Sequence, residues 1–359
     1  MKEVDFFVCP VCKNSLQKEE RKFVCLKCKK EYKILNSVYD FSNLELSEET
    51  KKTVEQFGKS WEIFSHIEDY HKKQFLEWIY PLQEEDFKDK VVLEAGCGKG
   101  RHSIIVSCFK PKHLFSVDLS EAIFIAEKNY SFFLDDKEER PDFDFVKSSP
   151  EGTSGFGAKD SSRANSQGSN QNDKRKAISF VRADLKKLPF PDESFDLVFC
   201  VGVLHHIDKM EEALNEIWRV LKTKGKLCLW VYGREGNLWI IYLLNPIRKL
   251  ITSKIPTKIL RIFSFPLTLS LFLLLKTIYG PITNWGKKES FLYYSSYLGS
   301  ISPFPFKEIE SIVVDHLCPP VAYYLSRKEI EEMTNPLSPS EVTFRWHHKN
   351  SWTIILNKK

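Results

Sequence analysis

The sequence contains no Asp or Glu between Gly236 and Lys288, although the 359 residues include 48 acidic ones. It also lacks a long uninterrupted apolar run there. The longer apolar segment, residues 262–275, has 14 residues, whereas roughly 20 are needed to cross a bilayer. Pro266 is expected to interrupt it further. No transmembrane helix is therefore predicted.

The N-terminal segment lacks the pattern of a secretory leader. Residues 1–7 contain no apolar core followed by a small-residue cleavage site, so no secretory signal is expected. The nine cysteines also lack the even distribution of a disulfide framework, because two close pairs lie near the start and five are scattered in apolar contexts. We expect a cytoplasmic protein. A net charge of +5 with 28% charged residues does not by itself indicate a class of binding partner.

Four of those cysteines form two Cys-x-x-Cys pairs. Cys9 and Cys12 are followed after twelve residues by Cys25 and Cys28. Four thiolates at this spacing suit tetrahedral Zn²⁺ and leave no position for water, so the site would be structural. A redox dithiol is the alternative. We predict a zinc ribbon over residues 1–45, with strands near 22–24 and 32–35, whose folding depends on the metal.

Residues 46–87 are predicted to be a helical linker. Phe57, Trp61 and Phe64 recur at helical spacing, which indicates one apolar face. The favoured interpretation is a helix packed on the main domain. A lid over a ligand is the alternative.

A glycine-rich loop follows a short apolar strand, Val91–Leu93. Gly96, Gly98 and Gly100 come directly after Glu94, where a strand would turn into a helix. The spacing differs from the dinucleotide pattern G-x-G-x-x-G, and the acid would repel a pyrophosphate. A cationic nucleotide such as S-adenosylmethionine fits better, although a structural turn is an alternative for the loop alone.

The chain then alternates strands and helices, which predicts an α/β fold. A strand over 113–118 ends in Asp118, which is 24 residues after Glu94, and one over 177–184 ends in Asp184. Carboxylates at these strand ends can accept hydrogen bonds from ribose hydroxyls and from an adenine amine. Residues 148–176 interrupt the alternation; 16 of these 29 residues are Gly, Ser, Asn or Gln, so we predict a disordered surface loop.

These motifs, with Leu204-His-His and the Leu188-to-Asp196 turn, resemble the class I S-adenosylmethionine-dependent methyltransferases over residues 88–232. Within them, the chain most resembles the branch of quinone-biosynthesis C-methyltransferases and tRNA wobble-uridine methyltransferases. The resemblance implies a seven-stranded Rossmann-like sheet, mixed, with its last strand antiparallel. It also implies that the glycine loop surrounds the methionine part of the cofactor, that Asp118 binds the ribose and that Ala183 and Asp184 lie beside the adenine. The full set of implied cofactor contacts is Glu94, Gly96, Cys97, Gly98, Gly100, Asp118, Leu119, Ala183, Asp184 and Val201.

The family sheet would be completed by residues 326–359. Ser326 and Glu329 form a capping-box pattern at the start of a helix, and two strands follow, near 340–346 and 351–357. Residues 233–325 are therefore an insertion, predicted to be helical, apolar and basic. It suits a lipid-linked substrate or peripheral membrane contact through 238–288 at the inner face of the membrane. A packed helical cap is nearly as well supported, and nucleic-acid binding is less favoured.

The predicted reaction needs little catalytic apparatus, because methyl transfer requires a positioned acceptor and the removal of one proton. No catalytic residue is assigned, and the candidates are two histidines after the fourth strand and three residues of the insertion: His205, His206, Asp315, His316 and Tyr324. One of the two adjacent histidines is expected to be a packed core residue.

The predicted function is a methyltransferase acting on a small metabolite, a lipid, or a lipid-linked or glycan acceptor. The fusion to a zinc ribbon also resembles tRNA methyltransferases that work with a small zinc-ribbon activator, so a tRNA wobble-uridine enzyme is the alternative. A non-catalytic cofactor-binding module is the second alternative.

Overall fold

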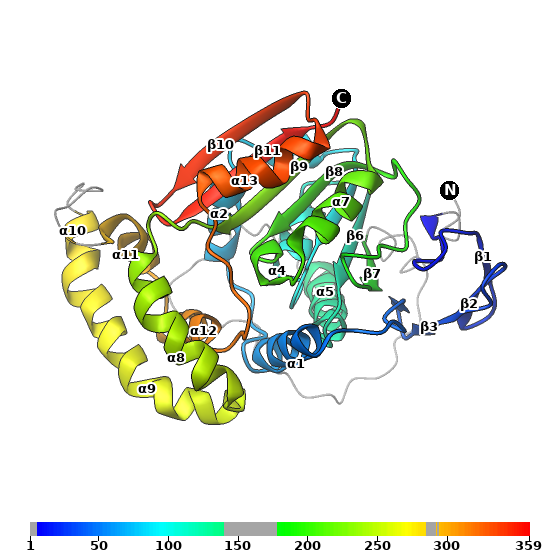
Figure 1. Ribbon diagram of the computed structural model, residues 1–359. Coiled ribbons are helices and arrows are strands. Elements are labelled where there is room, and N and C mark those ends of the chain that lie inside the picture. The colour runs from blue at the N-terminus through cyan, green and yellow to red at the C-terminus, as the bar shows by residue number, and fades with distance from the viewer. Residues whose placement is uncertain (1–5, 140–177, 285–291, 293) are drawn as a thin grey trace.

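The fold is built on one mixed sheet of eleven strands (Figure 1). The computed structural model describes residues 6–139, 178–284, 292 and 294–359, so the predicted loop at 148–176 lies outside the described residues. Seven strands form the expected methyltransferase-like part, in the order β7-β6-β5-β8-β9-β11-β10. These strands are β5 (Val91–Ala95), β6 (His113–Asp118), β7 (Ile178–Arg182), β8 (Phe195–Val201), β9 (Leu221–Tyr232), β10 (Glu341–His347) and β11 (Ser351–Asn357).

The predicted α/β class and the antiparallel final strand are confirmed, because β11 pairs antiparallel with β9 and β10. The strand count of seven is too low for the whole sheet. Four N-terminal strands continue it beyond β7: β1 (Leu16–Lys18), β2 (Lys22–Cys25), β3 (Glu31–Leu35) and β4 (Val38–Asp40). The junction is a parallel pairing of β4 with β7, with Val38 opposite Phe180. An edge strand has unpaired backbone groups, and β4 supplies their partners.

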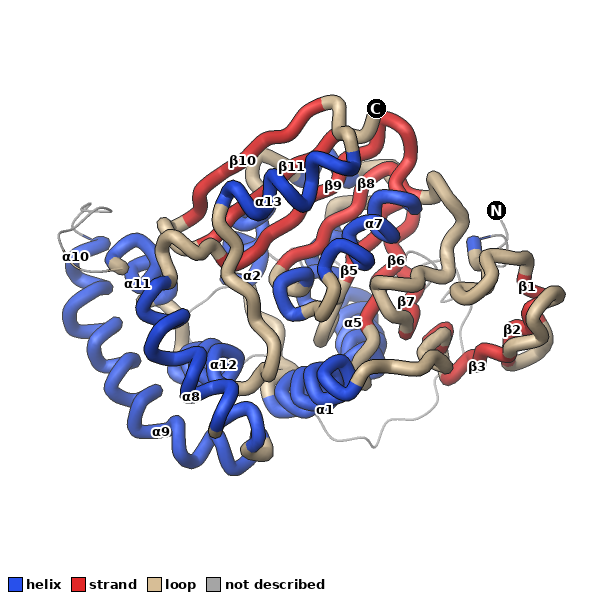
Figure 2. The backbone as a smooth tube through the Cα atoms, viewed as in Figure 1, coloured by secondary structure: helices blue, strands red, loops and turns tan. Residues whose placement is uncertain are grey.

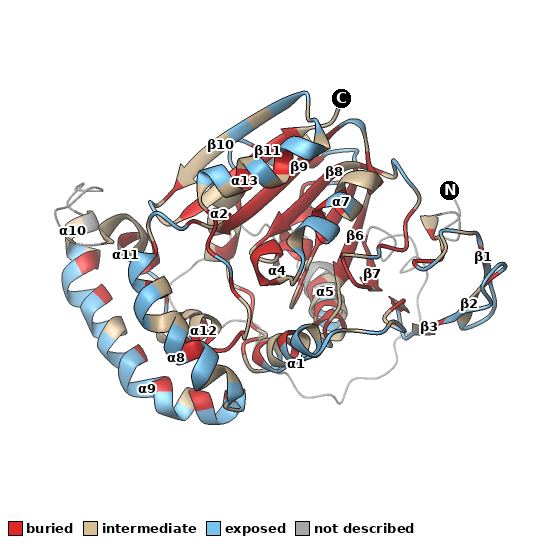
Figure 3. Ribbon diagram, in the orientation of Figure 1, coloured by how far each residue is buried: buried red, intermediate tan, exposed pale blue. Residues whose placement is uncertain are grey.

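Two apolar layers cover the sheet (Figures 2 and 3). On one face, buried side chains of α7 (Met210–Val220) and α13 (Arg327–Thr334) pack with the N-terminal ribbon strands. On the other face lie α2 (Tyr70–Ile79), α3 (Glu84–Phe87), α4 (Arg101–Cys108) and α5 (Ala122–Glu139). Because both faces are covered, every residue of β5 is buried.

Local capping signals set two helix starts. The predicted capping box at α13 is confirmed, since the Ser326 hydroxyl accepts from the Glu329 amide and the Glu329 carboxylate accepts from the Ser326 amide. The helix α1 (Glu48–Ile63) begins at Ser47, whose hydroxyl accepts from the Thr50 amide. Ser47 also donates to Asp208 near the carboxyl end of β8, which ties α1 to the sheet.

The insertion is a set of helices beside the sheet: α8 (Asn245–Leu250), α9 (Thr257–Leu274), α10 (Gly280–Asn284), α11 (Ser295–Ile301) and α12 (Phe306–Leu317), with π-helical turns at Ile240–Leu244 and Leu275–Tyr279. The expectation that Pro266 interrupts the apolar segment is wrong, because α9 continues through it. Pro266 is exposed, and it removes only one backbone hydrogen bond, on the outer side of the helix. By length and composition alone, the continuous helix Thr257–Ile282 could cross a membrane, with 22% of its most apolar window buried.

Candidate functional site

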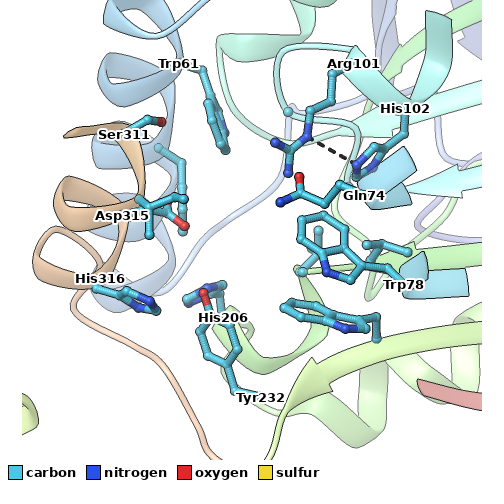
Figure 4. Close-up of a pocket in the computed structure, with 18 of the residues that line it drawn as sticks. Trp61, Gln74, Trp78, Arg101, His102, His206, Tyr232, Ser311, Asp315 and His316 are labelled. Carbon is cyan, nitrogen blue, oxygen red and sulfur yellow. Dashed lines mark hydrogen bonds between the residues drawn. The ribbon is translucent and has the colours of Figure 1, made fainter. Parts of the chain in front are cut away.

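A cavity of about 650 Å³ lies at the carboxyl ends of β5, β6 and β8, within the size range of small-molecule sites. Its core wall comes from the glycine loop and the strand ends, α1 and α2 contribute a second side, and α12 of the insertion closes the third. Figure 4 shows Asp315 and His316 of α12 across the cavity from Trp78 and Arg101. The predicted helix at 46–87 therefore both packs on the domain and lines the cavity.

The glycine loop has the unusual dihedrals that its composition predicts. Gly96 has φ of 90° and Gly100 has φ of 80°, both in the left-handed region. A Cβ on Gly96 would lie 2.4 Å from the Val203 side chain, and one on Gly100 would lie 2.8 Å from Ala126. The protein's own packing thus requires these two glycines. Gly98 is different, because a Cβ at this position would lie nearest to the Trp61 ring, which lines the cavity.

Seven of the ten predicted cofactor contacts line the cavity: Gly96, Cys97, Gly98, Asp118, Leu119, Asp184 and Val201. Glu94, Gly100 and Ala183 do not line it. They are buried, so their contact with a ligand stays a prediction.

Glu94 supports the loop from behind. Its carboxylate accepts hydrogen bonds from the Ser103 and Ser116 hydroxyls, and the side chain is buried. Burial raises the pKa of Glu94 to about 8, although both serine hydrogen bonds act in the opposite direction. The acid therefore links β5, α4 and β6.

Asp118 occupies the tip of β6 and organises two turns. One carboxylate oxygen accepts from the Gly98 amide at 2.8 Å, and the other accepts from the amide and hydroxyl of Ser120. These three hydrogen bonds hold the carboxylate at the cavity wall and leave about one lone pair, on the oxygen that faces Gly98, for a ligand. Asp184, at the next strand end, accepts from the Lys186 amide, and burial raises its pKa.

The two adjacent histidines have different surroundings. His205 is fully buried against Tyr232 and does not line the cavity, and neither ring nitrogen has a hydrogen-bond partner among the described residues. His206 lines the cavity, and its Nδ1 lies 2.7 Å from the Val321 carbonyl. Only a protonated Nδ1 can donate there, so Nε2 of the neutral ring retains its lone pair. Burial lowers the pKa of His206 to about 4, which keeps the ring neutral. The packed-core interpretation therefore fits His205.

The three candidates from the insertion also line the cavity: Asp315, His316 and Tyr324. Asp315 Oδ1 is buried without a partner among the described residues, and burial raises the pKa of this carboxyl to about 6. Burial lowers the pKa of His316 to about 4. Figure 4 shows both side chains directed toward His206 and Tyr232.

A buried charge cluster, which the sequence analysis missed, holds α12 to the core. Glu308 accepts from His66 Nε2 at 3.1 Å and from His71 Nε2 at 3.2 Å. His71 Nδ1 accepts from the Glu68 amide, so Nε2 carries the donated proton. Burial alone would raise the pKa of Glu308, but these hydrogen bonds hold it well below its usual range. No local pattern could reveal the cluster, because its histidines precede Glu308 by 242 and 237 positions.

The four predicted metal-ligating cysteines are brought together in the ribbon. The sulfurs of Cys9, Cys12, Cys25 and Cys28 all lie within 4.8 Å of one another. The Cys9–Cys28 and Cys12–Cys25 separations are 3.6 and 3.4 Å. A tetrahedron with Zn–S bonds of about 2.3 Å has edges of about 3.8 Å, so the donor set fits zinc.

The similarity to known protein sequences covers short parts of the chain. The family model described as "Methyltransferase domain" matches residues 156–229. The match assigns β7, β8, α7 and most of β9 to a methyltransferase domain. A protein of Methanocaldococcus jannaschii is 49% identical over 56 residues, which is 16% of this chain and 24% of that protein. The ubiquinone/menaquinone biosynthesis C-methyltransferase UbiE of Ectopseudomonas mendocina is 42% identical over 60 residues, 17% of this chain and 23% of that enzyme.

These matches are partial. The chain covers between 23% and 29% of the length of its first curated relatives. Among solved structures, a SAM-dependent methyltransferase from Aquifex aeolicus matches with a TM-score of 0.39 and 12% identity, over 82% of this chain and 100% of that one. The matched segment includes β7, β8 and α7, whereas the glycine loop, Asp118, the helical insertion and the ribbon lie outside it.

Proposed function

We propose that this chain is an S-adenosylmethionine-dependent methyltransferase whose acceptor binds between the methyltransferase domain and the insertion. The observation that carries the proposal is one cavity that holds Asp118 and Asp184 at its core wall and Asp315 at its insertion wall. Acids at adjacent strand ends suit an adenosine, and the remaining half of the cavity leaves room for an acceptor.

The core wall would hold the methyl donor. Asp118 retains about one lone pair for a ribose hydroxyl, and Asp184 can accept from the adenine amine. The loop at Gly96–Gly98 would border the methionine end. When bound, S-adenosylmethionine supplies a methyl group on a sulfonium, whose C–S bonding pair returns to sulfur as the acceptor lone pair forms the new bond to carbon.

The half of the cavity that faces the insertion would orient the acceptor and remove its proton. His206 Nε2 has a free lone pair, and the Asp315 carboxylate is ionised above about pH 6. Either group can accept the proton that the acceptor loses on methylation. Trp78 and Tyr232 add aromatic surface to the same part of the cavity, which suits an acceptor with an apolar portion.

The proposed acceptor is a small metabolite, a lipid, or a lipid-linked or glycan compound. The exposed apolar helices of the insertion favour the lipid-linked class. The relatives named for ubiquinone/menaquinone biosynthesis are consistent with a quinone-like acceptor. A tRNA wobble-uridine substrate and a non-catalytic binding module are the alternatives to be tested.

The donor site is tested by calorimetry with S-adenosylmethionine. The wild type should bind it, and Asp118→Ala should bind about tenfold to hundredfold more weakly, because charge-assisted hydrogen bonds contribute about 1.5–3 kcal/mol. Asp135→Ala, at an exposed position of α5, is the matched control and should bind as the wild type does. Equal affinity of the Asp118 variant would refute the donor site.

The acceptor class is tested with a methyl-labelled donor and a cell lysate that is afterwards separated into lipid, small-metabolite and RNA fractions. The proposal expects label in the lipid or metabolite fraction. Label in RNA would favour the tRNA alternative, and donor binding without any transfer would favour the non-catalytic module.

We also propose that the four ribbon cysteines hold a structural zinc ion. The purified chain should contain about one zinc per molecule by mass spectrometry, and Cys12→Ser with Cys28→Ser should lose it. Cys108→Ser, away from the ribbon, should retain the metal. A wild-type protein without zinc that still folds after chelation would contradict the proposal.

A further inference from the structure

The helix α9 has an inverted distribution of side chains. Its buried positions include the small polar residues Thr257, Ser264 and Thr268. Its exposed positions carry large apolar side chains, with Ile262 at 72% and Phe263 at 73% exposure. A helix on a water-soluble surface shows the opposite arrangement. Small residues at the packed face and large apolar ones outside are typical of helices that contact lipid.

The apolar surface continues onto the segment before α9. Tyr242, Leu243, Leu250 and Ile251 are all exposed on the π-helical turn, on α8 and just after it. Figure 3 shows this pale-blue exposed surface along α8 and α9, at the side of the molecule away from the sheet. Contiguous apolar surface of more than a few hundred Å² is rare on soluble monomers and marks an interaction site.

The charged residues of this surface indicate which kind of partner it binds. Residues 236–288 contain no acidic side chain, and Lys249, Lys254 and Lys258 are exposed around the turn between α8 and α9. None of these three lysines forms an ion pair with a described residue. Apolar area flanked by unpaired lysines is complementary to a bilayer with anionic headgroups, where both contributions add.

The opposite face of α9 is attached to the protein along its length. Arg261 makes two hydrogen bonds to Glu310 of α12, and Lys276, 15 positions later, donates to the Ser302 carbonyl. Leu260 and Leu275 pack in one buried cluster with Val313 of α12. A helix held in this way cannot be surrounded by lipid, although the helix Thr257–Ile282, with 26 residues and about 39 Å long, could span a bilayer by length.

We infer that α8 and α9 form a membrane-docking surface that lies in the interface of an anionic bilayer, without crossing it. The exposed face of α9, led by Ile262 and Phe263, enters the acyl boundary, and the three lysines contact the headgroups. This inference does not depend on donor binding, so failure of either proposal leaves the other intact.

The experiment is flotation of the full-length protein with vesicles of phosphatidylcholine and phosphatidylglycerol. The wild type should float with the vesicles, and Ile262→Glu with Phe263→Glu should reduce the bound fraction at least tenfold. The matched control is Leu26→Glu with Phe132→Glu, two apolar residues elsewhere with 52% and 50% exposure, which should float as the wild type does. Circular dichroism and thermal unfolding verify that each variant is folded, independently of donor binding.

Two further arms complete the test. Replacing Lys249, Lys254 and Lys258 with Gln should weaken binding by about fivefold per lysine on anionic vesicles. The same change at exposed Lys52, Lys112 and Lys328 should have little effect. Equal flotation of the Ile262/Phe263 variant and the wild type would overturn the inference. Two other results would also overturn it. The first is a wild type that does not bind vesicles but forms a dimer, which the Ile262/Phe263 variant does not form. The second is a wild type that stays in the bilayer after extraction with alkaline carbonate, as a membrane-spanning protein does.

Discussion

The two walls of the cavity are held in place by different means. The core wall, from Gly96 to Asp118, rests on close backbone packing and hydrogen bonds between neighbouring strand ends. The insertion wall, which carries Asp315, rests on α12 and the buried carboxylate of Glu308. The core wall thus depends on local packing. The insertion wall depends on contacts between remote segments, which are the apolar cluster of α12 with Leu260 and Leu275 and the polar cluster around Glu308.

The largest expected effect is at that cluster. Glu308→Ala leaves His66 and His71 without their shared acceptor and Arg101 without its nearby carboxylate. We expect a loss of about 3–5 kcal/mol in the free energy of unfolding, measured by urea denaturation, because it breaks a buried charged network. Glu332→Ala, in an exposed pair with Lys328, should change it by less than about 0.5 kcal/mol.

The same cluster predicts a pH dependence. The pKa of Glu308 is held below its unfolded value, so the native state binds this proton less tightly than the unfolded state does. The contribution of Glu308 to stability is therefore fully present above its unfolded pKa and is lost as the pH falls through the folded one. A loss of stability in acid that is as steep in Glu308→Gln as in the wild type would contradict this.

A smaller effect is expected at the core wall. Gly96→Ala places a Cβ 2.4 Å from Val203 at a φ of 90°, so strain and overlap together should cost about 3 kcal/mol. Gly202→Ala is the matched control, since its φ is 77° but the nearest atom would be 3.9 Å away, and it should cost about 1 kcal/mol. Adding Val203→Ala should restore part of the stability of the Gly96 variant only. Equal losses for both glycines would show that overlap does not matter.

The smallest effect concerns turnover at the insertion wall. Because burial raises the pKa of Asp315 to about 6, the carboxylate is lost as the pH falls below that value. If this group accepts or orients the acceptor's proton, turnover should fall about tenfold per pH unit below about 6. Asp315→Asn should lower turnover and remove this acidic limb, while donor affinity stays unchanged. An acidic limb that persists in the variant would assign the proton to another group.

The stability effect of Asp315 has the opposite sign. Its folded pKa lies above the unfolded one, so the native state binds the proton more tightly. The stabilisation of the native state by protonated Asp315 is fully present below the unfolded pKa and is lost as the pH rises through about 6. Ionisation that serves turnover therefore destabilises the insertion wall, and Asp315→Asn should make stability less dependent on pH in this range.

Sequence reasoning succeeded where the chemistry is local. The left-handed glycines, the acids at the end of β6 and just after β7 and the capping box at Ser326 each depend on residues a few positions apart, and the four cysteines lie within one stretch of 20 residues. It failed where distant segments meet. The junction of β4 with β7 enlarged the sheet, and Pro266 did not end α9, because the rest of that helix is held by α12.

By itself, the sequence determined the α/β class, the left-handed glycines of the loop after β5 and the grouping of four cysteines, because backbone conformation and short-range spacing depend on neighbouring residues. Only the tertiary structure decided which histidine reaches the cavity and how α12 is held there. It also decided that α9 turns its apolar side chains outward. Burial and pairing depend on which remote segments pack together, and no periodicity within one helix reveals which of its faces meets the protein.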